Sequence, residues 1–196
     1  MITIDEITIV VDGREIIYDY SEQIPAGSIT VIVGPNGCGK STLLAAIAGD
    51  IAPDKGTITI DEHHPILTAA NTLAGIRSMV VQNQSFTLGF TVAQIIEMAG
   101  DSAHVMKALE LTDLADRLVT TLSGGEAQRV AIAQAIAQNT PVLLLDEPLA
   151  AQDVHSRGRI IALLQDLAEQ GKTIVVVAHS NETELSWADK VIKQFH

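Results

Sequence analysis

The sequence predicts an α/β fold, built on a mostly parallel sheet that helices cover on both faces. Segments with strand character alternate along the chain with segments of helical spacing. Several strand segments are apolar throughout, as in residues 142–145, and strands buried on both faces are typical of parallel sheets. Signals for antiparallel pairing are confined to the N-terminus, where they predict a β hairpin. With 196 residues, the chain has room for one domain with an ordinary core.

The first part of the chain carries the antiparallel hairpin and the first strands of the parallel sheet. Residues 2–11 alternate apolar and polar side chains, which predicts a half-exposed strand. Asp12-Gly13 predicts a turn, after which residues 16–20 return as the hairpin partner. Next come a buried strand, a helix and two further strands, expected at 28–33, about 41–48, 57–61 and 76–81. Residues 62–76 are ambiguous, because Pro65 and Gly75 interrupt the pattern.

The second part begins with an inserted helical stretch. Residues 91–118 have apolar side chains at helical spacing, and Ser123-Gly124-Gly125 opens a long helix that should run to about Gln138. A buried strand, a helix and a last strand are then expected at 142–145, about 154–169 and 173–177. The prediction is a single domain, residues 1–196, with a core made of 1–84 and 136–196 and a short helical subdomain at about 85–135.

Composition excludes several classes of partner. The formal net charge of −12 disfavours direct binding to nucleic acid or to anionic lipid. Aromatic residues make up only 3%, so stacking platforms for single strands are also lacking. The histidines do not form a metal-ligand spacing and are expected at the surface: His63, His64, His104, His155 and His196.

Three further features of the sequence predict a cytoplasmic location. No stretch of 18 or more residues is free of charged and turn residues, so no membrane span and no direct membrane insertion are expected. The N-terminus lacks the basic region of a signal peptide. The single cysteine, Cys38, cannot form an internal disulfide.

Residues 34–41 match the phosphate-binding pattern G-x-x-x-x-G-K-[ST], between a β-branched run and a segment of helical spacing. Glycines let a backbone wrap an anion, so that N–H groups and the helix N-terminus point at phosphates. Lys40 adds a positive charge, and the Ser41 hydroxyl is a candidate Mg²⁺ ligand. The sequence therefore predicts binding of a nucleoside triphosphate by Gly34, Pro35, Asn36, Gly37, Cys38, Gly39, Lys40 and Ser41.

An acidic pair, Asp146-Glu147, follows the apolar strand at 142–145. Ligands of open parallel sheets collect at the carboxyl ends of the strands, which makes Asp146 a candidate Mg²⁺ ligand through water. Glu147, adjacent but pointing elsewhere, is a candidate general base for an attacking water. Taken alone, Asp-Glu-Pro after a strand is more often a turn, but the phosphate loop earlier in the chain favours the functional interpretation.

A serine and two glycines stand at the start of the helix after Leu122. This helix N-terminus could bind a second anion. Ser123, with Glu126 three residues later, also fits a capping box. Both can be true, because capping explains Ser123 and Glu126 but not two consecutive glycines in the first turn.

Taken in their order along the chain, these motifs resemble those of the ATP-binding cassette (ABC) ATPases, the nucleotide-binding subunits of ABC transporters. The resemblance covers nearly the whole chain. Residues 34–42 resemble the Walker A loop, 142–147 the Walker B motif with its catalytic glutamate, and 122–128 the LSGGQ-type signature. The positions that match the Q-loop glutamine, the D-loop aspartate and the switch histidine are Gln82, Asp153 and His179. The resemblance implies a P-loop NTPase fold of ABC type.

The resemblance also implies an ATPase that uses Mg²⁺ and works as a head-to-tail homodimer. ATP bound at Lys40 of one copy would be closed over by the signature of the other, which completes the charge stabilisation and excludes solvent. The implied catalytic residues are Glu147, His179, Gln82 and Lys40, and the implied Mg²⁺ ligands are Ser41, Gln82 and Asp146. Beyond the residues of the phosphate loop, the residues implied to contact ATP are Thr42, Ser123, Gly124, Gly125, Glu126 and Asp153.

This sequence departs from the family in three ways. The family has an aromatic side chain on the first hairpin that stacks on adenine, and that place falls near Val11 here, with Tyr18 or Tyr20 as alternatives. Base selectivity should therefore be modest, with GTP accepted nearly as well as ATP. The interval between Gln82 and Ser123 is shorter than the family's usual helical subdomain, so the docking surface of this subdomain should be small. The chain also stops soon after the switch histidine, and no C-terminal regulatory domain is expected.

The segment after Gln82 holds Phe86, Leu88 and Phe90 in a chain poor in aromatics. These side chains either pack the helical subdomain onto the core or form an apolar groove for a helix of a membrane partner.

The leading hypothesis is the ATPase subunit of an ABC transporter, bound at the cytoplasmic face of the cell membrane to permease subunits that this chain lacks. The alternative is a soluble ABC ATPase of a protein-assembly system, as in iron–sulfur cluster biogenesis. The charge disfavours a nucleic-acid-directed ABC protein. A binding-only protein is disfavoured by the presence of all the catalytic positions.

Overall fold

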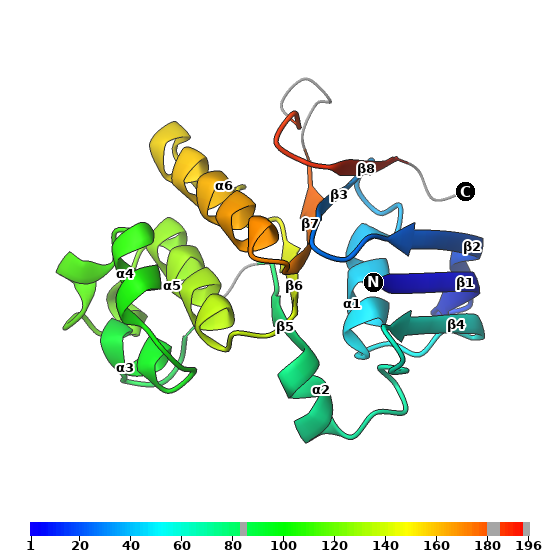
Figure 1. The fold of residues 1–196 in the computed structure, drawn as a ribbon, viewed down its shortest axis with the longest axis horizontal. Helices are drawn as coiled ribbons and strands as arrows, with labels where there is room; N and C mark the ends of the chain where they lie inside the picture. The colour runs from blue at the N-terminus through cyan, green and yellow to red at the C-terminus, as the bar shows by residue number, and fades with distance from the viewer. Residues whose placement is uncertain (83–85, 180–184, 194–196) are drawn as a thin grey trace.

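Two sheets, one antiparallel and one parallel, make up the core of the computed structural model, which describes residues 1–82, 86–179 and 185–193 (Figure 1). The antiparallel sheet has the strand order β2-β1-β4, and the parallel sheet has the order β5-β6-β7-β3-β8. The strands are β1 Ile2–Val11, β2 Arg14–Ile24, β3 Ile29–Val33, β4 Lys55–Ile60, β5 Arg77–Val80, β6 Val142–Asp146, β7 Thr173–Ala178 and β8 Lys190–Lys193. All four pairings in the second sheet are parallel, which confirms the predicted α/β fold.

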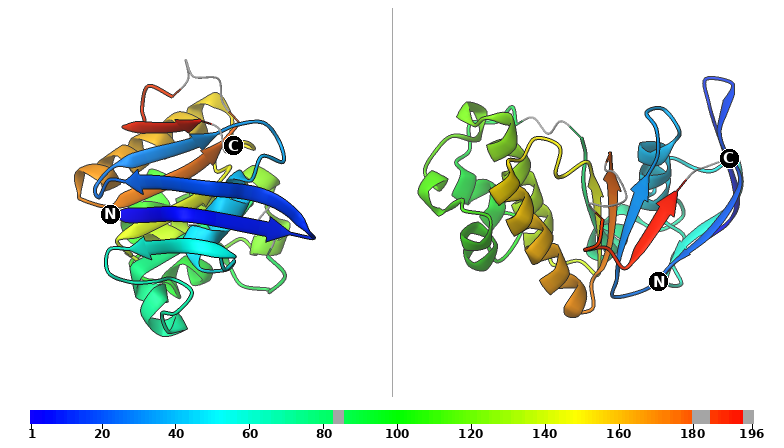
Figure 2. Two further views of the ribbon diagram at one scale, coloured as in Figure 1. Left: turned by 90° about the vertical axis from the view of Figure 1, so that its right-hand side faces the viewer. Right: turned by 90° about the horizontal axis from the view of Figure 1, so that it is seen from above.

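Helices cover both faces of the parallel sheet. The helices are α1 Lys40–Ala48, α2 Ala70–Ile76, α3 Val92–Glu97, α4 Ala103–Ala108, α5 Gly124–Ala137 and α6 Val154–Glu169, with 3₁₀ turns at Thr112–Leu114 and Val119–Thr121. Helix α1 lies between the two sheets, and α5 and α6 lie on the opposite face of the parallel sheet (Figure 2). Val31 and Ile32, neighbours on β3, belong to different hydrophobic clusters because successive strand residues point to opposite faces. This two-sided burial explains why the central strands are apolar throughout.

Helices α3, α4 and α5 form a group at the end of the molecule away from the antiparallel sheet (Figure 1). Thr91 caps α3 with a full capping box, in which its side chain accepts a hydrogen bond from the Gln94 N–H and the Gln94 side chain accepts one from the Thr91 N–H. The helical periodicity predicted for residues 91–118 is confirmed, although it is divided into short helices and 3₁₀ turns. Within the described ranges, no helix is long and apolar enough to cross a bilayer.

Two features of the sheets differ from the sequence prediction. Strand β4 pairs antiparallel with β1, so antiparallel pairing is not confined to the N-terminal hairpin. Strand β8 was not predicted, because Lys190–Lys193 offers only two apolar residues between two lysines. Within the described part of the chain it is an edge strand that pairs with β3, and an edge strand does not need a long apolar run. The ambiguous segment 62–76 contains α2, which begins at Ala70.

Candidate functional site

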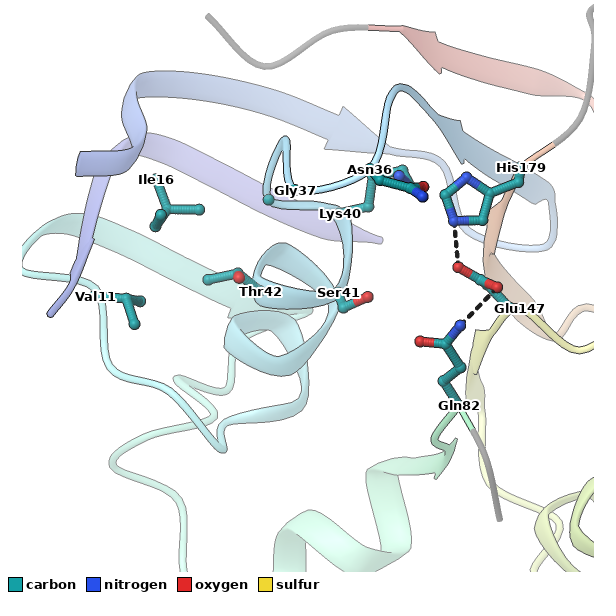
Figure 3. A pocket seen from close by; sticks show the side chains of 11 residues that line it. Val11, Ile16, Asn36, Gly37, Lys40, Ser41, Thr42, Gln82, Glu147 and His179 are labelled. Carbon is teal, nitrogen blue, oxygen red and sulfur yellow. Dashed lines mark hydrogen bonds and ion pairs between the residues drawn. The ribbon is translucent and has the colours of Figure 1, made fainter. Parts of the chain in front are cut away.

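A cavity of about 370 Å³ opens beside the N-terminal end of α1. This volume falls within the usual range for small-molecule sites. Three groups of side chains line it in Figure 3: an aliphatic pair on one side, polar residues of the phosphate loop in the middle, and an acid–amide–imidazole cluster on the other side. The lining residues are Val11, Ile16, Asn36, Gly37, Gly39, Lys40, Ser41, Thr42, Gln82, Glu147 and His179. The structure therefore brings together predicted site residues from four separate motifs.

The phosphate loop joins the buried strand β3 to α1. Gly39 is the N-cap of α1 and has a φ of 100°, a left-handed conformation that glycine adopts without strain. A Cβ at this position would also lie only 2.9 Å from Ile16 Cγ2. Among the described residues no side chain caps α1, and its first turn holds no acidic residue. Its free N–H groups therefore leave a positive helix end at the cavity.

Lys40 is the first residue of α1 and is buried, with 5% of its surface exposed. Its Nζ donates hydrogen bonds to the carbonyl oxygens of Gly34 and Pro35, at 2.9 and 2.8 Å. The amine is thus folded back on its own loop and lies at the cavity wall. Gly34, Pro35 and Cys38 shape the loop without lining the cavity.

Asp146 ends strand β6 and is 5% exposed. Its Oδ1 is buried and has no hydrogen-bond partner among the described residues. Burial raises the pKa of Asp146 and Glu147 adds to this effect, whereas the Ser41 hydroxyl and the Lys40 charge oppose it. A buried carboxylate oxygen without a partner, next to a hydroxyl, fits the oxygen-donor set of a Mg²⁺ site.

Gln82, Glu147 and His179 meet because each follows a different strand of the parallel sheet. Their strands, β5, β6 and β7, are neighbours in the sheet, so their carboxyl ends lie at one edge. Gln82 Nε2 donates to Glu147 Oε2 at 2.8 Å, and His179 Nε2 lies 2.5 Å from Glu147 Oε1 (Figure 3). The Glu147 backbone has a φ of 50°, which is uncommon for a residue with a side chain, and its N–H donates to the Val177 carbonyl. The carboxylate is therefore held at a fixed place on the cavity wall.

The signature residues do not line this cavity within one protomer. Ser123 caps α5 by accepting from the Glu126 N–H at 3.3 Å, and a Glu126 carboxylate oxygen accepts from the Ser123 N–H at 2.7 Å. These bonds confirm the predicted capping box. The bond from the Ser123 backbone, with help from Arg117, lowers the pKa of Glu126.

The two signature glycines have different surroundings. A Cβ on Gly125 would lie 2.8 Å from the carbonyl oxygen of Ala151, so packing inside the chain requires glycine there. A Cβ on Gly124 would meet nothing within 4 Å. Packing among the described residues therefore does not explain why position 124 is a glycine.

Asp153 also lies outside the cavity and caps α6, accepting from the Ser156 N–H at 2.7 Å. This backbone hydrogen bond lowers the pKa of Asp153. The predicted residues thus form two groups: those that line the cavity, and those at the N-terminal ends of α5 and α6.

The aliphatic end of the cavity is formed by Val11 and Ile16, on the two strands of the hairpin. The sequence placed the family's adenine-stacking position near Val11, with Tyr18 or Tyr20 as alternatives. Val11 lines the cavity, whereas Tyr18 and Tyr20 do not. Ile16 was missed as a site residue, since its only sequence signal was its place in the hairpin. His63, His64, His104 and His155 are exposed and do not line the cavity, whereas His179 does line it. Among the described residues, no group of three or more His, Cys, Asp or Glu side chains is placed to hold a metal ion.

Comparison with known proteins places this geometry in a family. A protein-family model described as ABC transporter matches residues 17–150. The hemin import ATP-binding protein of Rhodococcus jostii is 36% identical, and the alignment covers 96% of this chain and 69% of that protein. The cobalamin import ATP-binding protein of Halobacterium salinarum is 38% identical, with 92% and 49% covered. A dimeric ATP-binding cassette bound to ADP and phosphate has a TM-score of 0.87 at 27% identity, covering 100% of this chain and 94% of that one.

Proposed function

This chain belongs to the ABC transporter family, and from that premise we propose that the cavity beside α1 is its ATP-hydrolysis site, with Glu147 as the general base. The chain is an ATP-binding and ATP-hydrolysing subunit that energises transport through separate membrane subunits. The relatives named above give no support to the soluble assembly ATPase that the sequence left as an alternative.

The observation that carries the proposal is the position of Glu147. Its carboxylate lies across the cavity from the positive end of α1 and is held from two sides by Gln82 and His179 (Figure 3). A phosphate bound at the helix end would place its terminal group between Lys40 and this carboxylate. A water molecule at that place could lose its proton to Glu147 as it attacks.

The other cavity residues would stabilise charge. The free N–H groups of the first turn of α1 and the Lys40 amine can bind the phosphate oxygens on which charge develops. His179 can donate a hydrogen bond to the terminal phosphate and orient the water. Ser41, Asp146 and Gln82 would hold a Mg²⁺ ion, which supplies positive charge to the phosphates.

We propose that two copies complete each site. One protomer leaves its cavity open to solvent, and the exposed N-terminal end of α5 offers a second positive helix end. Gly124, whose Cβ position is open, would let a phosphate approach the backbone of a partner copy. Ser123, Gly125, Glu126 and Asp153 would then contact ATP across the interface. In this arrangement residues 1–84 and 136–196 bind the nucleotide, and the helical subdomain at about 85–135 carries the signature.

The membrane partners would be permease subunits, which hold the chain at the cytoplasmic face of the membrane through protein contacts. The relatives are named for import of hemin and cobalamin, which supports import as the direction of transport. Phe86 is half-buried against the hydrophobic cluster on the α5 and α6 side of the parallel sheet, which supports a packing role for this side chain. Leu88, which is 62% exposed in the same segment, is the better candidate for a partner contact.

Leu88→Asp is expected to reduce recovery of the membrane subunit at least about tenfold, because a carboxylate in an apolar contact loses the burial of a leucine and adds a desolvation cost. The measurement is affinity purification of the tagged protein from detergent-solubilised cells, with partners quantified by mass spectrometry. Basal ATPase activity should be unchanged.

The matched control is Leu67→Asp, at a leucine that is 82% exposed outside this segment. Equal recovery of the membrane subunit with both variants would contradict the docking site. Recovery of the wild-type protein only with soluble partners would contradict the transporter role itself.

The aliphatic end of the cavity predicts weak base selectivity. Neither Val11 nor Ile16 offers a hydrogen bond or an aromatic face to a nucleobase. GTP should therefore displace ATP with an affinity within about threefold of that of ATP itself, since one extra hydrogen bond would be worth about 1 kcal/mol. Val11→Tyr should raise the affinity for ATP by about 5- to 50-fold through stacking on the base.

Val10→Tyr is the matched control, because Val10 is as exposed as Val11 but points to the other face of β1 and does not line the cavity. Competition binding with ATP, GTP and UTP measures both effects. A strong preference of the wild-type protein for ATP over GTP would refute this prediction.

A further inference from the structure

The start of α5 and the loop that precedes α6 are in close backbone contact. Gly125 packs on the carbonyl of Ala151 at a distance that leaves no room for a Cβ. The loop between β6 and α6 is compact, because the Ala150 N–H donates to the Glu147 carbonyl at 3.2 Å and the Gln152 N–H donates to the Leu149 carbonyl at 3.3 Å. The general base therefore belongs to a closed loop that touches the signature helix.

Gln152 joins these two segments through its side chain. It is buried, with 8% of its surface exposed. Its Nε2 donates to the Gly125 carbonyl at 3.1 Å, and its Oε1 accepts from an Arg129 guanidinium nitrogen at 3.4 Å. Both ends of one amide are thus bonded to residues four apart on the same face of α5.

Two further polar groups lie buried in the first half of α5. Arg129 Nε and Gln128 Nε2 are buried and have no hydrogen-bond partner among the described residues. A buried amide is costly unless its donor and its acceptor are both bonded. If the helix moved relative to the loop, Gln152 would lose both bonds, so the side chain fixes the position of α5 against the loop that carries Glu147.

We propose that Gln152 is a positioning residue that couples the two ATP sites of the dimer. The inference rests on the proposed function, in which Glu147 acts on the ATP of its own protomer and the start of α5 acts on the ATP of the partner. A fixed link between them within one protomer makes closure of one site favour closure of the other. Such a link produces positive cooperativity in ATP.

Gln152→Met tests the proposal, because methionine has a similar length and suits a buried place but makes neither hydrogen bond. The concentration of ATP that gives half-maximal turnover should rise about 5- to 10-fold, and the Hill coefficient should fall toward one. Binding of a fluorescent ATP analogue to dilute, monomeric protein should be unchanged, because Gln152 does not line the cavity. A merely structural defect would instead lower the thermal stability without changing the Hill coefficient.

Gln152→Glu separates the two hydrogen bonds. The carboxylate still accepts from Arg129 but cannot donate to the Gly125 carbonyl, so the same loss of cooperativity is expected. If Gln152→Met does not fold, the Hill coefficient of Gln152→Glu alone tests the proposal. Gln165→Met, at an exposed position on α6, is the matched control and should behave as wild type.

Wild-type cooperativity in Gln152→Met, or its full recovery in Gln152→Glu, would overturn the inference. A wild-type protein that neither hydrolyses ATP nor dimerises with it would instead contradict the proposed function. The two failures are therefore distinguishable in one set of measurements.

Discussion

Glu147→Gln is expected to lower ATP turnover at least about 100-fold while leaving ATP binding intact, because general-base catalysis is worth about 10²- to 10⁴-fold. The amide has the size of the carboxylate and can keep a contact with His179, but it cannot accept the proton of the attacking water. In the proposed dimer the terminal phosphate of ATP is bound by both copies, and hydrolysis would remove this link. The variant should therefore also accumulate as an ATP-bound dimer. Phosphate release, equilibrium binding of ATP and size-exclusion chromatography with Mg²⁺ and ATP measure the three effects.

Glu169→Gln, an exposed glutamate at the end of α6, is the matched control and should have wild-type activity. A near wild-type rate in Glu147→Gln would exclude Glu147 as the base. In that case its contacts with Gln82 and His179 would have only a structural role.

Lys40→Met is expected to weaken ATP binding by about 10- to 100-fold, because hydrogen bonds from a charged group are worth about 1.5–3 kcal/mol. The amine is buried at the cavity wall, and within the described residues its hydrogen bonds go to two carbonyls of its own loop. A phosphate can therefore take over these bonds without displacing another charge. Methionine keeps most of the aliphatic length of the side chain. Titration calorimetry with ATP measures the affinity.

Lys107→Met, on the exposed face of α4, is the matched control and should leave ATP affinity unchanged. The melting temperature of Lys40→Met should fall by a few degrees, because the variant loses the two hydrogen bonds to loop carbonyls but breaks no ion pair within the described residues. Unchanged ATP affinity in the Lys40 variant would show that the nucleotide does not bind at this loop.

Local patterns predicted most of the fold. Period-two alternation predicted β1, full apolarity predicted β3, β6 and β7, and helical spacing predicted α6 with its bounds. Strand β8 escaped prediction because an edge strand of four residues has too few apolar positions to form a pattern. The antiparallel pairing of β4 escaped for a different reason, since the periodicity of a strand does not tell which neighbour it will pair with.

The sequence by itself determined the phosphate loop, since a glycine pattern between a buried strand and a helix needs no distant partner to take its conformation. It also determined the capping box at Ser123 and Glu126, which forms within one helical turn. Only the tertiary structure decided that Gln82, Glu147 and His179 meet, because that requires β5, β6 and β7 to be neighbours. Only the tertiary structure placed Ile16 against Gly39 and joined Gln152 to α5. Hydrogen bonds and turns within a few residues are readable from spacing, whereas contacts between distant segments depend on strand order and packing, which arise from the whole chain at once.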